Sequence, residues 1–422
     1  MKIAIIGAGI TGLSTAYYLS QKGHTVTIYE QSDHAGGLGS SLRVGGTTIE
    51  RFYHHLFRSD VHVIQLLTEL GLRSQLKFYP AKTSVLTRAK LFPFSSPIDL
   101  LQFSALSFLD RIRLGYALFE LKFLPQRMKE LDAISATAWL KQHAGSAAYD
   151  TLWKPLLVGK FANYASTVPA AWLRDRLRDR SFDLGYLNGG AQTLFDALLK
   201  RLKKQRVTIR YRSAVTDVKE LKDWVQVQVG NHSARFDRCL ITTVSPIASR
   251  LITSPISPSI KKQLNQQDQL GAVCLLLELD RAIQDQYWVN ICNSSSPVLV
   301  MVEHTNMISP ERYGGNHLVY LANYIHRTKP GYRQSDEEII SSYTTILKQL
   351  NPSFSHTWIQ KATVSRSPRA QTVFGLHSFA SRPPHQLTDR IFLGNIDQMY
   401  PHDRNFNLGV EMGKKLSIDV IS

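Results

Sequence analysis

Gly7-Ala8-Gly9-Ile10-Thr11-Gly12 is the stretch that decides the fold of this chain, because the segments on either side of it follow different patterns. Residues 2–6 before it form a short apolar run, which is typical of a buried parallel strand. Residues 11–22 after it place apolar side chains at helical spacing. A G-x-G-x-x-G turn between a strand and a helix indicates a Rossmann-type dinucleotide site. Its glycines permit the tight turn, the approach of backbone to a pyrophosphate and close helix–sheet packing.

The segment after this helix completes a strand–helix–strand unit. Residues 24–30 have the pattern of a second strand, which ends at Glu30. A carboxylate there can accept hydrogen bonds from both ribose hydroxyls of an adenosine and would repel a 2′-phosphate, which disfavours NADP. We expect Ile10, Thr11 and Gln31 beside the same dinucleotide, with its pyrophosphate at the helix N-terminus. The alternative is a glycine-rich turn followed by a surface glutamate, and the combined spacing favours the dinucleotide site.

A second glycine loop, Gly36-Gly37-Leu38-Gly39-Ser40-Ser41, follows Glu30. Consecutive glycines let backbone pass beside a large flat ligand. Loops with two glycines are common, but the position of this one directly after Glu30 favours a ligand. We therefore place Gly36, Gly37 and Leu38 in the cofactor site.

The composition of the 422-residue chain bounds its class. It is 43% hydrophobic and 20% charged, as in an ordinary globular protein, but its net charge is +17. That charge favours an anionic partner: a phosphorylated cofactor, an acidic substrate, anionic lipid or nucleic acid. Nucleic acid is disfavoured, because the basic residues are spread along the chain and no motif interleaves them with aromatic residues. Cys239, Cys274 and Cys292 have neither zinc nor disulfide-framework spacing, so we predict no metal site and a reducing, cytoplasmic setting.

No stretch of the sequence has the pattern of a membrane span or a signal peptide, and prolines interrupt the best candidate, residues 91–109. The apolar residues 100–123 and the net charge of +17 nevertheless favour association with an anionic membrane surface. In that interpretation Phe103, Leu106 and Leu114 insert into the bilayer. The alternative is an ordinary packed helical core.

Segments of the dinucleotide type occur at the start, in the middle and at the end of the chain. We therefore predict an α/β fold, with a discontinuous Rossmann-like cofactor domain, a mixed α+β substrate domain and a helical insertion. The predicted cofactor domain comprises residues 1–80, 186–246 and 386–422, and the predicted substrate domain comprises residues 81–185 and 247–385. Helices are predicted at residues 96–124, 136–160, 194–204, 336–350 and 407–420.

Several blocks of the sequence resemble the flavin amine oxidase superfamily, which includes protoporphyrinogen oxidases, phytoene-type desaturases and, more distantly, UDP-galactopyranose mutases. They are the two N-terminal glycine loops, Gly189-Gly190-Ala191-Gln192-Thr193-Leu194, Ile391-Phe392-Leu393-Gly394-Asn395 and Asn407-Leu408-Gly409-Val410-Glu411-Met412-Gly413. The resemblance implies FAD. It also implies that the link is non-covalent, since no cysteine lies in the closing motif, where members with covalent flavin carry one.

The resemblance assigns further cofactor contacts. It implies that the backbone of Val215 meets the adenine ring, and that the helix containing Leu408, Gly409 and Val410 points its N-terminus at the pyrimidine end of the flavin. Such a helix end stabilises negative charge on the reduced ring. Two positions in the cofactor motifs depart from the family pattern: Leu38 stands where an arginine usually follows the glycine pair, and Asn395, after Gly394, replaces the usual aspartate.

Candidate catalytic residues lie in residues 49–57, a segment that runs towards the isoalloxazine in related flavoenzymes. Tyr53, His54 and His55 form a candidate acid–base or substrate-orienting set. The alternative is a strand that exposes one histidine and buries the other. Lys160 is a further candidate, because amine oxidases often place a lysine, through water, near flavin N5, although no motif matches it to that lysine.

Arg366, Arg369 and Arg404 are candidates for anchoring a substrate carboxylate or phosphate, with surface arginines on a basic protein as the alternative. The resemblance implies an FAD-dependent oxidoreductase that takes hydride from a C–H or C–N carbon and passes electrons to oxygen or a quinone. Residues 91–124, rich in Phe and Leu, favour an apolar polycyclic or polyprenyl substrate. Two alternatives stay open: a non-redox mutase acting on a nucleotide sugar, and a non-catalytic flavin-binding scaffold.

Overall fold

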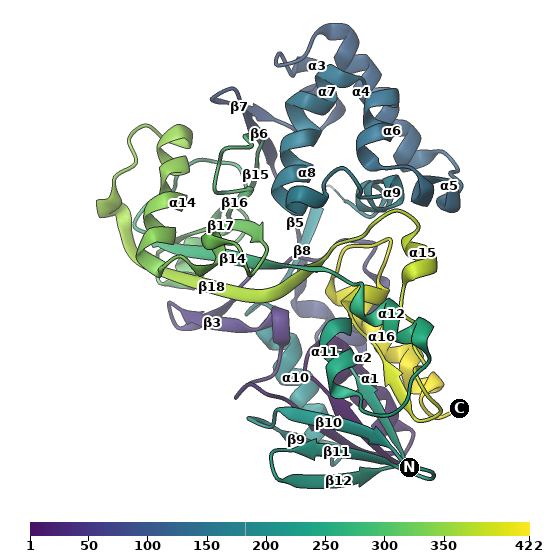
Figure 1. The fold of residues 1–422 in the computed structure, drawn as a ribbon. Helices are drawn as coiled ribbons and strands as arrows, with labels where there is room; N and C mark the ends of the chain where they lie inside the picture. The colour runs from purple at the N-terminus through teal and green to yellow at the C-terminus, as the bar shows by residue number, and fades with distance from the viewer. Residues whose placement is uncertain (182) are drawn as a thin grey trace.

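A computed structural model describes residues 1–181 and 183–422 of the chain. Figure 1 shows three parts stacked along the long axis. The lower part is an α/β unit that holds both termini, the middle part is a large mixed sheet, and the upper part is a lobe of helices. Strands from the beginning, middle and end of the chain meet in the lower part.

The lower part is built on a five-stranded parallel sheet. Its central strand, β1 (Lys2–Ile6), is buried from Ile3 onwards, as expected for an apolar strand covered on both faces. The strand order is β19 (Ile391–Leu393), β13 (Arg238–Ile241), β1, β2 (Thr25–Tyr29) and β9 (Thr208–Arg210).

Alternate residues of β1 face two different layers. Ile3 and Ile5 belong to the core formed with the helices on one face, and Ala4 and Ile6 to the core on the other. The helices of the first face are α1 (Ile10–Gln21), α2 (Val61–Glu69), α10 (Ala191–Lys204) and α16 (Phe406–Asp419). The second face carries a three-stranded sheet of β10 (Val215–Glu220), β11 (Val225–Val229) and β12 (His232–Phe236), with α11 (Ser245–Leu251) and α12 (Pro258–Asn265).

The middle part is a seven-stranded mixed sheet. Its strand β14 (Gln269–Leu279) is buried along its whole length between two antiparallel neighbours, β17 and β18. One face is covered by α14 (Asp336–Leu350), which Ser335 caps. The strand order is β18 (Ile359–Thr372), β14, β17 (His317–Ile325), β16 (Val300–Glu303), β15 (Trp288–Ile291), β6 (Thr83–Thr87) and β7 (Lys90–Pro93).

The helical lobe has its own apolar core, which includes Phe103, Trp139 and Phe161. Its helices are α3 (Pro97–Gln102), α4 (Phe108–Phe123), α5 (Met128–Ala133), α6 (Ala136–His143), α7 (Ser146–Ala148), α8 (Lys154–Phe161) and α9 (Ala170–Arg178). The short pairs β3 (Ser41–Val44) with β4 (Thr47–Glu50) and β5 (Leu76–Pro80) with β8 (Asp183–Leu187), and the helices α13 (Pro330–Arg333) and α15 (Ser378–Ser381), complete the fold.

The predicted fold class is confirmed, and the helix predicted at 336–350 has those bounds. All three cysteines are buried and free. Within residues 1–181 and 183–422, no helix combines the length and the hydrophobicity that a bilayer crossing needs.

One prediction about the helical segment is wrong. Phe103, Leu106 and Leu114 are at most 5% exposed, because they pack inside the helical lobe instead of facing solvent. The ring of Phe103, for example, lies 4.9 Å from that of Phe92, centroid to centroid. These three side chains cannot insert into a membrane while the lobe stays folded.

Candidate active site

The two glycine loops lie side by side at the carboxyl end of the parallel sheet. The backbone N–H of Gly36 donates to the carbonyl oxygen of Ala8 at 2.9 Å, and Gly9 and Gly36 form an isolated parallel bridge. Gly7 and Gly36 have φ values of +109° and +120°, which side chains rarely allow. The loops meet because β1 and β2 are parallel neighbours that end at the same edge of the sheet.

The space in front of α1 fits a dinucleotide. α1 begins after Gly9 without a side-chain cap from any described residue, so the backbone N–H groups of its first turn are available to a ligand. A Cβ at Gly9 would meet nothing within 4 Å, whereas a Cβ at Gly12 would lie 2.1 Å from the carbonyl oxygen of Gly7. Gly9 therefore faces open space, while Gly12 permits the tight packing of α1 on its own turn.

Glu30 is fixed beside this space at the end of β2. Its two carboxylate oxygens accept the backbone N–H groups of Ala8 at 2.8 Å and Ser32 at 2.9 Å. Only 9% of the residue is exposed. Each oxygen keeps a further lone pair, which can accept from a ribose hydroxyl. Gln31, the next residue, is exposed.

Two buried hydroxyl groups near the loops have no partner among the described residues. They are Oγ of Ser41, at the end of the second glycine loop, and Oγ1 of Thr243, just after β13. A buried hydroxyl without a hydrogen bond is costly, so both indicate a ligand that carries polar groups. The open helix N-terminus, the fixed carboxylate and these hydroxyls together suit a dinucleotide.

The closing motif packs tightly and bonds to the protein itself. The side-chain amide of Asn395 donates to the carbonyl oxygen of Thr243 at 2.7 Å and to Oγ of Ser245 at 3.2 Å. A Cβ at Gly394 would lie 2.2 Å from Leu416, and a Cβ at Gly409 would lie 2.5 Å from Ile10. These glycines therefore let α16 approach β19 and α1.

Tyr53, His54 and His55 lie in the segment after β4 and are partly buried. Nδ1 of His54 lies 2.5 Å from the carbonyl oxygen of Phe52, and its ring stacks on Phe406 with centroids 4.8 Å apart. Nδ1 of His55 is buried and has no partner among the described residues. Burial, with smaller contributions from nearby arginines, lowers the pKa of His54 to about 4 and that of His55 to about 3. Burial raises the pKa of Tyr53 well above its ordinary value.

A largely buried ion-pair network adjoins these residues and centres on Asp403, in the segment before α16. Oδ2 of Asp403 lies 2.5 Å from Nη1 of Arg176 and 3.3 Å from Nζ of Lys160. Its Oδ1 accepts the indole N–H of Trp172 at 2.9 Å. Burial opposes the ionised form, but the charges of Lys160 and Arg176 outweigh it and hold the pKa of Asp403 well below its ordinary value.

Two further arginines lie at this network. Neither Arg180 nor Arg404 forms an ion pair with a carboxylate of the described residues, and Nε of Arg404 is buried without a hydrogen bond. Burial and repulsion by Arg176 lower the pKa of Arg180 to about 9. We call Lys160, Arg176, Arg180, Asp403 and Arg404 the Asp403 cluster; its cations outnumber its single carboxylate.

Residues 10–394 match the model of the family described as flavin containing amine oxidoreductase. The chain belongs to this family. The family is one of flavin-containing oxidoreductases, and the glycine loops, Glu30 and the N-terminus of α1 suit the dinucleotide of such a flavin. The resemblance inferred from the sequence motifs is confirmed.

Curated relatives of this amine oxidoreductase are distant. Coproporphyrinogen III oxidase of Staphylococcus aureus is 28% identical over 283 residues, which cover 57% of this chain and 60% of that protein. The 15-cis-phytoene desaturase of Synechococcus elongatus is 29% identical over 157 residues, 34% of this chain and 33% of that protein. Protoporphyrinogen oxidase of Nicotiana tabacum is 25% identical over 296 residues, 57% of each chain. The matches thus span 60% or less of the relatives' own length.

Solved structures share the whole fold of this amine oxidoreductase. An oxidoreductase from Methanosarcina mazei superposes with a TM-score of 0.75 at 17% identity, covering 99% of this chain and 100% of that one. Cyclohexylamine oxidase from Brevibacterium oxydans gives 0.73 at 14% identity, covering 99% and 98%. Reduced UDP-galactopyranose mutase gives 0.79 at 13% identity, covering 100% and 93%. These likenesses confirm the fold and do not separate oxidase from mutase chemistry.

The three arginines predicted as substrate anchors do not lie together. Arg404 belongs to the Asp403 cluster, whereas Arg366 pairs with Asp336 of α14 at 2.5 Å. Arg369 lines a separate cavity with Arg327. Lys160, which no sequence motif identified, is a member of the Asp403 cluster. The predicted roles of these residues, and those of Val215, Leu408 and Val410 in FAD binding, stay predictions.

Sequence reasoning missed Glu50 and most of the Asp403 cluster. The buried carboxylate of Glu50 accepts the N–H of Ala191, the first residue of α10, at 2.6 Å and the hydroxyl of Tyr186 at 2.8 Å. Glu50 therefore fixes the start of α10 through charge at a helix N-terminus. The sequence signal for the cluster was the alternation of arginine and aspartate over residues 174–180. Without knowledge of its partner, Asp403, this pattern indicates a solvated helix face.

Proposed function

We propose that this enzyme removes a hydride from a C–H or C–N bond of an apolar, polycyclic or polyprenyl substrate that carries an anionic group, with oxygen or a quinone as the electron acceptor. The Asp403 cluster is the observation that supports an anionic group on the substrate. Four cationic side chains lie around one carboxylate there, and only Lys160 and Arg176 pair with it. Cations withdrawn from water are costly without matching anions, so an anionic substrate would complete the balance.

The apolar part of the substrate is supported by two observations. The curated relatives are named for coproporphyrinogen, protoporphyrinogen, phytoene and zeta-carotene. In this chain the ring of Tyr53 packs edge-on against Trp288, with centroids 5.1 Å apart, and against Tyr320 at 6.1 Å. An aromatic wall of this kind suits a large flat or extended apolar body.

The bound flavin supplies the hydride acceptor, and the protein supplies position, charge and exclusion of water. Because Nδ1 of His54 donates to the carbonyl oxygen of Phe52, its Nε2 keeps a free lone pair. His54 and His55 stay neutral near pH 7, so they accept hydrogen bonds without competing with substrate charge. Tyr53 keeps its proton and can donate. In this proposal these three residues orient the substrate, while Arg180 and Arg404 bind its anion.

The experiment is anaerobic mixing of the FAD-loaded protein with a substrate panel in which each compound is offered as the free acid and as its neutral ester. We expect the absorbance of oxidised flavin to bleach with free acids, and the neutral esters to need about tenfold higher concentration. Equal reduction by acid and ester would refute the anionic group while leaving hydride transfer intact.

We also propose that FAD is held without a covalent bond. The three cysteines are buried in or beside β13, β14 and β15, outside the closing motif. Burial raises the pKa of Cys239, Cys274 and Cys292, which keeps these thiols protonated and unreactive. Acid denaturation should leave the yellow chromophore in the supernatant, and colour retained in the pellet would show a covalent link.

We also propose that the protein associates peripherally with an anionic membrane, through a surface other than Phe103, Leu106 and Leu114. α4 exposes Phe108, Ile112, Tyr116, Phe119 and Phe123, which recur at about one helical turn along one side. Leu109 extends this side, as do Ile98 and Leu101 of α3. We call these eight residues the apolar face.

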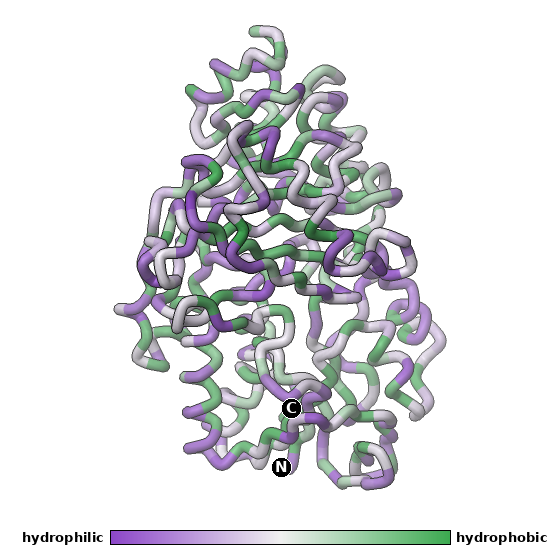
Figure 2. Tube along the Cα trace, turned by 90° about the vertical axis from the view of Figure 1, so that its left-hand side faces the viewer, coloured by the Kyte–Doolittle hydropathy of each residue, from purple (hydrophilic) through white to green (hydrophobic). Residues whose placement is uncertain are grey.

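The position and charge of the molecule favour a membrane as the partner of the apolar face. α3 and α4 lie at the upper end of the molecule, and apolar residues recur along the helices at that end in Figure 2. An exposed patch of this kind marks an interaction site. The net charge of +17 repels a second copy of the chain and attracts anionic lipid headgroups.

A further inference from the structure

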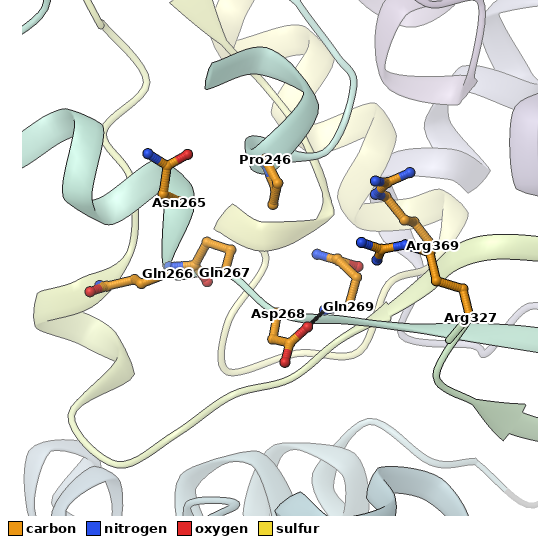
Figure 3. A pocket seen from close by; sticks show the side chains of 8 residues that line it. All are labelled: Pro246, Asn265, Gln266, Gln267, Asp268, Gln269, Arg327 and Arg369. Carbon is orange, nitrogen blue, oxygen red and sulfur yellow. Dashed lines mark hydrogen bonds between the residues drawn. The ribbon is translucent and has the colours of Figure 1, made fainter. Parts of the chain in front are cut away.

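A polar cavity lies where the lower and middle parts of the molecule meet (Figure 3). Its volume is about 250 Å³. The residues around it come from three places: the start of α11, the segment from the end of α12 into β14, and the ends of β17 and β18. Their side chains are mostly amides and guanidinium groups, in contrast to the aromatic wall beside Tyr53.

The cavity carries unpaired positive charge. Arg327 and Arg369 line it, and neither side chain forms an ion pair or hydrogen bond with any residue within 1–181 or 183–422. Their guanidinium groups repel each other, and burial together with this repulsion lowers the pKa of Arg369. Asp268, the carboxylate in the wall, is already engaged by the hydroxyl of Tyr164 and the backbone N–H of Gln269.

Gln269 adds a second, independent sign of a ligand. The residue is 1% exposed, and its side chain lines the cavity in Figure 3. Its amide nitrogen donates to Oγ1 of Thr372 at 3.1 Å and also to Asp397. Its Oε1 is buried and has no donor among the described residues. A buried carbonyl oxygen of this kind indicates a ligand that donates an O–H or N–H hydrogen bond.

We propose that this cavity binds a second anionic group of the substrate, a phosphate or carboxylate that lies next to a hydroxyl and is separate from the group that Arg180 and Arg404 bind. Arg327 and Arg369 bind the oxyanion, and Oε1 of Gln269 accepts the hydroxyl hydrogen. The site rests on the proposed function, because it is joined to the Asp403 cluster. Oγ1 of Thr372 accepts the side-chain amide of Gln269. The preceding residue on β18, Gln371, accepts a hydrogen bond from Nζ of Lys160 at 3.1 Å.

The binding test uses the FAD-loaded protein, titrated in a calorimeter with inorganic phosphate and with glycolate, a small hydroxy acid. We expect saturable binding of at least one of them. The Arg327→Gln/Arg369→Gln double variant should weaken it about tenfold or more, and Gln269→Leu about threefold. Lys361→Gln is the matched control: it removes one positive charge from the same strand, but its ammonium is already paired with Glu278 at 3.4 Å.

An unchanged affinity in the double variant, or an equal loss in Lys361→Gln, would overturn the site. The flavin spectrum of each variant shows whether FAD is still bound, so misfolding is not mistaken for loss of the anion.

A second arm separates this proposal from the proposed function and from a ligand unrelated to the substrate. For a compound that bleaches the flavin, we expect the double variant to need about tenfold more substrate while its limiting rate of bleaching stays within about twofold.

Phosphate should compete with that compound in the parent protein. Binding of phosphate without competition would assign the cavity to another molecule and overturn the proposal. Phosphate binding in a protein whose flavin no compound reduces would overturn the proposed function and leave an anion site.

Discussion

Buried Lys160 and half-buried Asp403 form an ion pair between the helical lobe and the segment that leads into α16. Nζ of Lys160 lies 3.3 Å from Oδ2 of Asp403, and it also donates to Oε1 of Gln371 on β18 at 3.1 Å. One lysine therefore connects α8, the mixed sheet and the start of the closing helix. The pair therefore links the helical lobe to the α/β unit that contains α16.

Replacing Asp403 with asparagine should therefore destabilise the protein. Lys160 and Arg176 would lose their common carboxylate inside the molecule, and breaking a buried pair on one side costs about 3–5 kcal/mol of unfolding free energy. Asp285→Asn is the control, because its ion pair with Lys82 is exposed and should contribute about 0.5 kcal/mol or less. Urea unfolding of both variants measures the difference, and equal small losses would show that the Asp403 pair is not a structural link.

Gly9→Val should abolish FAD binding without unfolding the protein. Gly9 has an extended backbone with φ −77° and ψ 178°, which valine adopts readily, and the space at its Cβ is open. The added side chain would occupy the place expected for the pyrophosphate. Flavin absorbance per protein should fall about tenfold or more, while the thermal midpoint of the apoprotein stays within a few degrees.

Two further glycine variants serve as controls for Gly9→Val. Gly375→Ala, also in open space but outside the glycine loops, should keep its flavin. Gly12→Ala should instead destabilise the apoprotein, because its Cβ would lie 2.1 Å from the carbonyl oxygen of Gly7. Full flavin occupancy in Gly9→Val would remove the basis for placing the pyrophosphate at α1.

Replacing Phe108, Ile112 and Phe119 with serine should abolish the part of liposome binding that resists high salt. These side chains are 62%, 48% and 49% exposed, so the change should leave the packed lobe folded. Sedimentation with anionic vesicles at low and high ionic strength separates the electrostatic and apolar contributions.

The control carries serine at Val61, Val158 and Ile418, which are also exposed but lie outside the apolar face. It should bind vesicles as the parent does. No sedimentation of the parent even at low salt, or a concentration-dependent dimer that the serine variant abolishes, would argue for a different partner of the apolar face.

His402 should make the protein lose stability at alkaline pH. Although burial opposes its charge, hydrogen bonds to Asp175 and Asp179 raise the pKa of His402 from 6.5 to about 10. Its contribution is therefore fully present below pH 6.5 and is lost as the pH rises through about 10. Unfolding free energies at pH 6, 8 and 10 should fall more steeply for the parent than for His402→Asn. A variant of the exposed His232 serves as the control, and identical slopes for parent and His402→Asn would contradict the ion-pair assignment.

The local part of the fold and of the candidate cofactor site could be predicted from sequence. Gly7, Gly9, Gly12 and Glu30 lie within one strand–helix–strand unit, and backbone sterics and helix electrostatics alone determine where they meet. α14 was predictable for a similar reason, since Ser335 and the acidic first turn mark its beginning.

The contacts between distant segments could not be predicted in this way. Asp403 meets Lys160 and Arg176 where the helical lobe packs against the segment before α16, and no local sequence pattern indicates that tertiary contact. The helical lobe gave the clearest error. Phe103 and Phe108 are both apolar residues of the same segment, but Phe103 is 1% exposed and Phe108 is 62% exposed. Sequence periodicity shows that a helix has apolar sides and does not show which side finds a partner.

The central claim is that the bound FAD takes a hydride from an anionic substrate with an apolar body. The most direct test follows flavin absorbance during anaerobic addition of such compounds, and then the consumption of oxygen or quinone when the acceptor is admitted. We predict bleaching by at least one carboxylated or phosphorylated apolar compound, followed by reoxidation with one acceptor consumed per product formed. No bleaching by any compound, together with turnover only after prior chemical reduction and no net consumption of acceptor, would contradict the claim and indicate mutase-like chemistry.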